Sequence, residues 1–117
     1  MRQQAFGIDI DEKKAYAVFK VYTTRIGMRR ALAKVHHPTN SNVFGSCLHS
    51  IDFSQKVGIP GGHIFLNEED LGSGKVAHEI YHLVEHILNE FDGVKDGETG
   101  AYLMQDTTTM FWDWWLE

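Results

Sequence analysis

The clearest hydrophobic pattern in the chain runs from Lys75 to Phe91. Apolar residues recur there at steps of three and four, which gathers them on one side of a helix; they are Val76, Ile80, Leu83, Val84, Ile87, Leu88 and Phe91. Asp92-Gly93 follows, and Gly93 suits a left-handed C-cap. We therefore predict an amphipathic helix whose buried side is fixed.

Two earlier segments show the pattern of strands. Residues 5–10 (AFGIDI) and 15–23 (AYAVFKVYT) are rich in β-branched and aromatic residues and alternate in part, with a charged stretch between them. We predict a strand pair here. The alternative is that residues 16–22 join the helix that follows.

That following helix is predicted from Thr24, a candidate N-cap, to about Val35. His36-His37-Pro38 ends it, because a residue before proline is disfavoured in a helix. Its outer face is basic, with Arg25, Arg29, Arg30 and Lys34. A charged outer face is the ordinary means of keeping a helix in water, and contact with an acidic partner or RNA is the alternative.

The middle and the end of the chain complete the predicted elements. Residues 43–53 indicate a strand, residues 54–62 carry turn signals in their glycines and proline, and residues 63–67 (HIFLN) form a short strand. A second helix from about Glu98 to Trp115, with Asp96 as a possible cap, returns antiparallel to the long helix. The pattern predicts an α+β fold with a short, mostly antiparallel sheet of 3–4 strands on the long helix, followed by a C-terminal helix.

Length and charge limit the classes of protein to which the chain can belong. A chain of 117 residues fits one domain, 1–117, and its formal charge of −5 disfavours nucleic acid or anionic lipid as a partner. The sequence has no apolar run of membrane-helix length and no signal-peptide core at its N-terminus. We expect a cytoplasmic protein without membrane contact. The single cysteine, Cys47, excludes an internal disulfide and fits a buried small apolar residue.

The long helix carries the motif His78-Glu79-Ile80-Tyr81-His82. Residues four apart lie one turn apart on the same side of a helix, so the two imidazoles can reach one Zn²⁺ while Glu79 flanks its open position. At about 100° per residue the two histidines lie nearly opposite the apolar stripe, with Glu79 toward its flank. The motif predicts a zinc hydrolase site, provided that other parts of the chain form a cleft there.

A catalytic zinc usually has three protein ligands. Glu98, at the start of the second helix, is our candidate for the third, and the alternative is that Glu98 only complements the helix dipole. His86 is excluded, since it lies about 12 Å along the axis from His78 and one straight helix cannot close all three histidines on one ion. His86 is instead expected in a cleft wall or beside a ligand. A metzincin-type site would require a third His at position 88, where this chain has Leu88, so the sequence does not predict a site of that class.

The motif followed by Glu98 resembles the gluzincin class of zinc metallopeptidases. HEIYHLVEH is also similar to the ImmA/IrrE-like metallopeptidases, and Glu98 with Ala101-Tyr102-Leu103 is similar to short phage-encoded proteins of this type. The resemblance implies a zincin-like domain with His78, His82 and Glu98 as zinc ligands and Glu79 as the catalytic glutamate, in a host cytoplasm if the protein is phage-encoded. Thermolysin-like gluzincins carry an Asp where this chain has Tyr102. In such peptidases the strand ahead of the helix, here 63–67, commonly presents an exposed sheet edge to an extended peptide.

These features predict a zinc-dependent metallopeptidase in which Glu79 is the general base for a metal-activated water and a peptide or protein is the substrate. Tyr102, one turn after Glu98, is our candidate for a donor to the oxyanion, and the alternative is a packed tyrosine. Tyr81 and His63 are weaker candidates. One rival function is a metal-dependent hydrolase of another substrate. A second rival is a catalytically idle zinc-binding module.

The C-terminus is rich in aromatic residues, in the order Phe111-Trp112-Asp113-Trp114-Trp115. Some of these rings are expected to pack as core. Three tryptophans so close together on a helix cannot all face inward, so Trp112, Trp114 and Trp115 are candidates for a homodimer or partner contact. The idle-module alternative uses this aromatic end to dock its partner.

Overall fold

One four-stranded sheet forms the centre of the described part of the chain. In the computed structural model, residues 1–10, 12–34, 46–49, 59–91 and 97–117 are described. The strands are β1 (Arg2–Ile10), β2 (Lys13–Tyr22), β3 (Ser46–His49) and β4 (Gly61–Asn67), in the spatial order β1-β2-β4-β3. β1 with β2 and β3 with β4 are antiparallel, whereas β2 and β4 are parallel.

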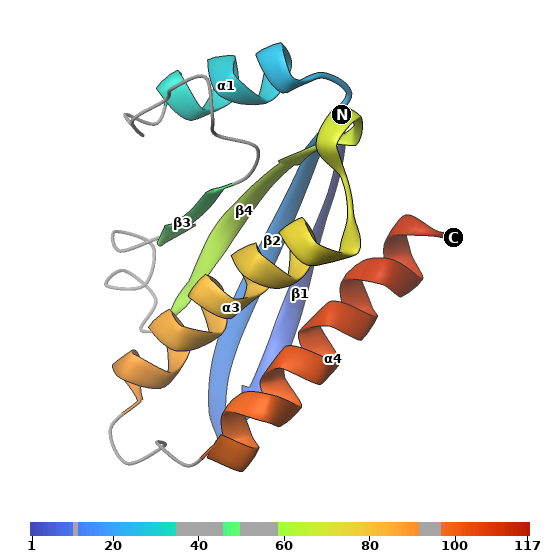
Figure 1. The fold of residues 1–117 in the computed structure, drawn as a ribbon. Coiled ribbons are helices and arrows are strands. Elements are labelled where there is room, and N and C mark those ends of the chain that lie inside the picture. Colours follow the sequence, from blue (N-terminus) through green and yellow to red (C-terminus); the bar gives the residue numbers. More distant parts are fainter. Residues whose placement is uncertain (11, 35–45, 50–58, 92–96) are drawn as a thin grey trace.

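Helices cover the two faces of this sheet unequally. α3 (Ser73–Glu90) and α4 (Gly97–Trp115) run in opposite directions across one face, and α1 (Arg25–Lys34) lies at one end of the molecule (Figure 1). A single 3-10 turn, η1 (Glu68–Asp70), joins β4 to the segment before α3. The predicted long helix and the returning helix are therefore confirmed with shifts of one or two residues at their ends.

The main core lies between the sheet and the pair α3 and α4. Alternate residues of β2 point into it, and the apolar stripe of α3 closes it from above. Phe19 and Phe111 are fully buried, with ring centroids 4.9 Å apart, so the centre of β2 meets the end of α4. The α3 side of this core includes Val76, Ile80, Leu83, Val84 and Ile87, as the helical spacing predicts.

A smaller core lies on the opposite face, under α1. Met28 and Leu32 are fully buried against Phe65 of β4. An ion pair fixes the start of α1, because Arg25 donates from Nε and Nη2 to the carboxylate of Asp70 at 2.8 and 2.7 Å. The guanidinium keeps the pKa of Asp70 below its ordinary value, and a side-chain hydrogen bond with Asn67 lowers it further. Separately, buried Asn67 accepts the Asp70 N–H on its Oδ1 at 3.0 Å.

The local signals before α1 behave as predicted. β1 and β2 form the expected strand pair, and residues 16–22 belong to β2 and do not join the helix. Thr24 caps α1, because its hydroxyl accepts a hydrogen bond from Gly27 N at 3.0 Å. The predicted strand at 43–53 is described only over β3, and the predicted helix-ending segments at 36–38 and 92–93 and the cap at Asp96 lie outside the described residues.

Two predictions around β4 are wrong. Gly61 and Gly62 begin the strand, where turn residues are predicted, because β4 extends its pairing back along β2 to Tyr16. The strand is not a sheet edge either, since β2 and β3 pair with its two sides. Gly61 is required there: a Cβ at this position would overlap the ring and the carbonyl oxygen of Tyr16.

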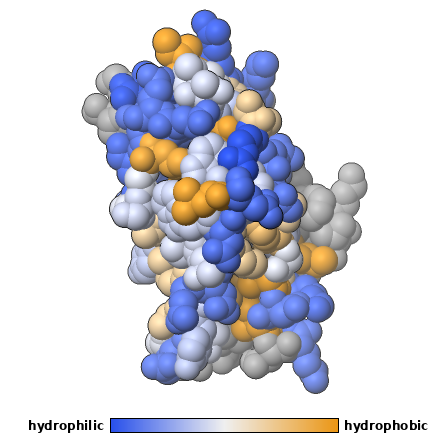
Figure 2. Space-filling model, turned by 90° about the vertical axis from the view of Figure 1, so that its right-hand side faces the viewer, coloured by the Kyte–Doolittle hydropathy of each residue, from blue (hydrophilic) through white to orange (hydrophobic). Residues whose placement is uncertain are grey.

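The fold class is α+β, as predicted, although one strand pairing of the mixed sheet is parallel. Among the described helices none is long and apolar enough to cross a membrane. Figure 2 shows a side of the molecule that is mainly hydrophilic, with hydrophobic residues in small separate patches.

Candidate metal centre

The first half of α3 carries the sequence-predicted motif. The helix begins at Ser73 after Gly72, whose carbonyl accepts the Val76 N–H at 3.0 Å. His78 and His82 are exposed, while Glu79 is only 7% exposed. Burial of the apolar stripe therefore turns both imidazoles outward and keeps the carboxylate between them at the buried flank, as the spacing predicts.

The two imidazoles lie against each other. Their Nε2 atoms are 3.2 Å apart, and the rings are nearly perpendicular, with centroids 4.7 Å apart. No other element is needed to produce this arrangement, since one helical turn separates the residues. The two Nε2 atoms therefore lie together beside the helix, at hydrogen-bond distance from each other.

This spacing fits a zinc ion. Two imidazole nitrogens at about 2.0–2.1 Å from a tetrahedral Zn²⁺ lie about 3.3–3.4 Å apart. The Nε2 distance of 3.2 Å is close to that value, so two of the ligand positions are present without rearrangement. Imidazole nitrogens are also a donor type that zinc prefers.

The structure does not bring Glu98 to this pair. Glu98 is exposed in the first turn of α4, next to Gly100, where a Cβ would lie 3.5 Å from Leu88 Cδ1. Leu88 lies six residues beyond His82, which is about 9 Å further along α3. Within the described ranges no three His, Cys, Asp or Glu side chains form a group that could hold a metal. The third ligand therefore stays a prediction from the sequence.

The two tyrosine candidates differ in their distance from the pair. Tyr102 is 60% exposed on α4, and within the described ranges it forms no ring contact or hydrogen bond with either histidine. Tyr81 is 54% exposed, but its ring centroid lies 6.1 Å from that of His82. Tyr81, which sequence reasoning ranked lower, is thus the tyrosine beside the pair.

The remaining histidines of the described helices and β4 lie elsewhere. His86 is half-buried on α3; burial lowers its pKa, and nearby Glu90 partly opposes that shift. His63 lies on the sheet face opposite α3, edge-on to Tyr16 with centroids 6.3 Å apart. Burial, and secondarily the charge of Lys20, lower the pKa of His63. His63 is therefore a wall of another site rather than part of the motif.

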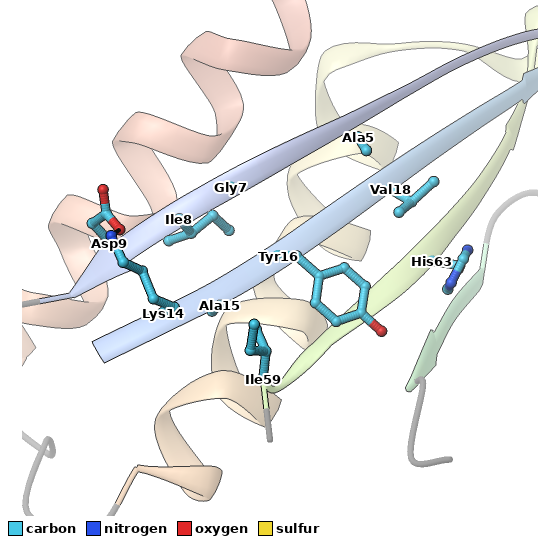
Figure 3. Close-up of a pocket in the computed structure, with 10 residues that line it drawn as sticks. All are labelled: Ala5, Gly7, Ile8, Asp9, Lys14, Ala15, Tyr16, Val18, Ile59 and His63. Atoms are coloured by element: carbon cyan, nitrogen blue, oxygen red, sulfur yellow. Dashed lines mark hydrogen bonds and ion pairs between the residues drawn. The ribbon is translucent and has the colours of Figure 1, made fainter. Parts of the chain in front are cut away.

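That other site is a hollow of about 660 Å³ on the face of β1, β2 and β4 away from α3 (Figure 3). Tyr16, Val18 and Ile59 line it, His63 lies at one end, and the Asp9–Lys14 ion pair (2.5 Å) lies at the other. This hollow was not predicted from the sequence. The only signal is the small residues Ala5 and Gly7 at alternate positions of β1, which leave room above the sheet.

The aromatic C-terminus packs largely within the molecule. Phe111 is fully buried and contacts Trp112, Trp114 and Trp115, all three of which are partly buried. Arg2 stacks over Trp114 and Trp115 and donates to their carbonyl oxygens at 3.2 and 3.1 Å. The rings therefore join β1 to the end of α4, and their role in a homodimer or partner contact stays a prediction.

Comparisons with protein-family models, with curated proteins and with solved structures found no match.

Proposed function

We propose that the protein is a zinc-dependent metallopeptidase whose site is built on α3. The observation that carries this proposal is the 3.2 Å spacing of His78 Nε2 and His82 Nε2 beside the buried Glu79. Two paired histidines alone would fit a structural site. The carboxylate between them, held at the buried flank, is the additional group that hydrolysis requires.

Each residue has a defined part in this proposal. His78 and His82 would hold the ion, which when bound supplies a positive charge that lowers the pKa of a water at the site. Glu79 accepts a proton from that water as it attacks the peptide carbonyl and passes the proton to the leaving amine. Its low exposure limits the rotamers that the side chain can adopt.

The substrate approach follows from the corrected sheet order. β3 is the outer strand on the side of β4 that lies away from β2, and it contacts α3. An extended peptide that adds to the sheet near the motif would therefore pair with β3. The sequence instead predicts pairing with the strand at 63–67, which is part of β4. Glu98 as third ligand and Tyr102 as oxyanion donor are retained from the sequence, with Tyr81 as the nearer alternative donor.

The test combines zinc binding with cleavage of a peptide library. His78→Asn is expected to weaken zinc binding at least tenfold, because it removes one of two positioned ligands. Glu79→Gln is expected to keep zinc and lose cleavage by a factor of about 10²–10⁴, the usual contribution of a general base. Glu85→Gln, an exposed glutamate on the same helix, is the matched control and should change neither measurement.

The outcomes separate the candidate functions. Cleavage that survives Glu79→Gln overturns the peptidase proposal. Zinc binding by a wild-type protein that cleaves no peptide favours the idle binding module instead. Wild-type protein that takes up no zinc contradicts both. Glu98→Gln, compared with Glu90→Gln, then decides the third ligand by zinc affinity alone.

A further inference from the structure

A groove lies between α1 and the sheet, on the face opposite the histidine pair. Its volume is about 390 Å³. Lys20, Tyr22 and Phe65 line it from the sheet, and α1 contributes Gly27, Arg30 and Lys34 among others. We call this the α1 groove. Its walls come from two strands and a helix, so it is a feature of the fold and not of one helix surface.

Among the described residues, the cations of this groove lack acidic partners. Lys20, Arg30 and Lys34 form no ion pair with any carboxylate in the described ranges, and no Asp or Glu lines the groove. Two cations elsewhere in the described chain do have carboxylate partners: Lys14 pairs with Asp9, and Arg25 pairs with Asp70. α1 itself contains no acidic residue. Three positive charges therefore converge on one concave site in a chain of net charge −5.

The floor of the α1 groove is aromatic and rigid. Phe65 is 2% exposed, and the ring of Tyr22 stacks parallel to it with centroids 6.1 Å apart. The Lys20 ammonium lies 5.1 Å from the Phe65 centroid, which fixes that charge over the floor. Burial raises the pKa of Tyr22, so its hydroxyl remains a neutral donor.

We propose that the α1 groove binds an acidic segment of a partner protein. Carboxylate side chains match its lysines and arginine in charge, and a short segment can satisfy them all within the groove. A polynucleotide fits less well. Its bases would find Phe65 already covered, and the net charge of −5 disfavours a long polyanion that extends beyond the groove. This proposal is independent of the zinc site.

The test measures the anisotropy of a fluorescein-labelled, glutamate-rich peptide at low and at physiological salt. Wild-type protein is expected to bind it, with affinity falling as salt rises. Arg30→Gln together with Lys34→Gln is expected to lower the affinity about five- to tenfold, the effect of losing two exposed charge pairs. Lys13→Gln together with Lys14→Gln removes the same charge at the β1–β2 turn and should change affinity less than about twofold.

Three results would overturn the proposal. The first is no binding of the peptide to wild-type protein at low salt. The second is an equal loss of affinity in both double variants, which would indicate a response to net charge only. The third is tighter binding of an oligothymidylate with the same number of charges, which would assign the groove to nucleic acid. Melting temperatures of the variants within a few degrees of wild type show that each remains folded.

Discussion

The two faces of the sheet are buried by different means. On one face, α3 and α4 cover residues of β1, β2 and β4 with one continuous core that reaches from Ile8 to Phe111. On the other face, α1 contributes only Met28 and Leu32 against Phe65, and an ion pair at its first turn supplements them. The candidate metal centre lies outside the large core, whereas the hollow and the α1 groove lie on the weakly covered face.

Because of this difference, one face of the sheet positions the histidine pair, and the other face leaves sheet surface accessible. The large core fixes the rotation of α3, so the outward direction of His78 and His82 needs no support from the other face. The small core leaves sheet surface open, and the hollow beside Tyr16 and the α1 groove form there. Damage to the large core should therefore affect folding and the metal centre together, while damage under α1 should affect α1 alone.

The largest expected effect tests that statement directly. Phe111→Ala should lower the free energy of unfolding by about 3–5 kcal/mol, and Leu32→Ala by about 2–3 kcal/mol, because the smaller cluster loses fewer neighbours. Urea denaturation measures both values. Hydrogen exchange should show α3 destabilised only in the Phe111 variant. Equal destabilisation of α3 by both variants would mean that the two faces form one cooperative unit.

An intermediate effect is expected where β4 begins. Gly61→Ala should destabilise the protein by about 1–3 kcal/mol, since its Cβ would overlap Tyr16 and force the two strands apart. Gly7→Ala is the matched control, because a Cβ on Gly7 meets nothing within 4 Å. Thermal melting of the two variants gives the comparison. A Gly61→Ala protein as stable as the Gly7→Ala protein would show that the parallel pairing of β2 and β4 is looser than described.

The smallest effect is a dependence of stability on pH. Burial lowers the pKa of His63 below 6.5, so the unfolded chain takes up this proton more readily than the folded one. The resulting stability is present above pH 6.5 and is lost as pH falls through and below that value. His63→Gln should reduce the slope of unfolding free energy between pH 7 and pH 5. His86, whose pKa is also lowered, keeps part of the slope, and an unchanged slope in the variant would assign the whole dependence to other groups.

Elements whose signals are local were predictable from the sequence. The stripe from Val76 to Phe91 fixes both the existence and the rotation of α3, and a helical spacing of four is enough to place His78 beside His82. Thr24 as a cap depends only on the residues that follow it. In each case the interacting residues lie within one or two turns, so chain connectivity supplies the geometry.

Features that depend on distant pairing were not predictable. The interior place of β4 depends on parallel pairing with β2, and nothing within residues 61–67 indicates that partner. The start of β1 at Arg2 was missed because its first residues are polar and become a strand only against Phe19 and Val21. Glu98 illustrates the same limit, since its distance from the histidines depends on how α4 packs along α3 and not on its spacing in the sequence.

The contact between Arg2 and the end of α4 has a consequence for synthesis on the ribosome. Arg2 and Trp115 are 113 residues apart in sequence. The two carbonyl groups that accept from the Arg2 guanidinium are therefore synthesised long after Arg2 itself. Phe111, which packs against Phe19, is also synthesised long after it. Nascent β1 and β2 therefore emerge with their apolar face uncovered, and this face needs protection, for example by a chaperone, until α4 has left the exit tunnel.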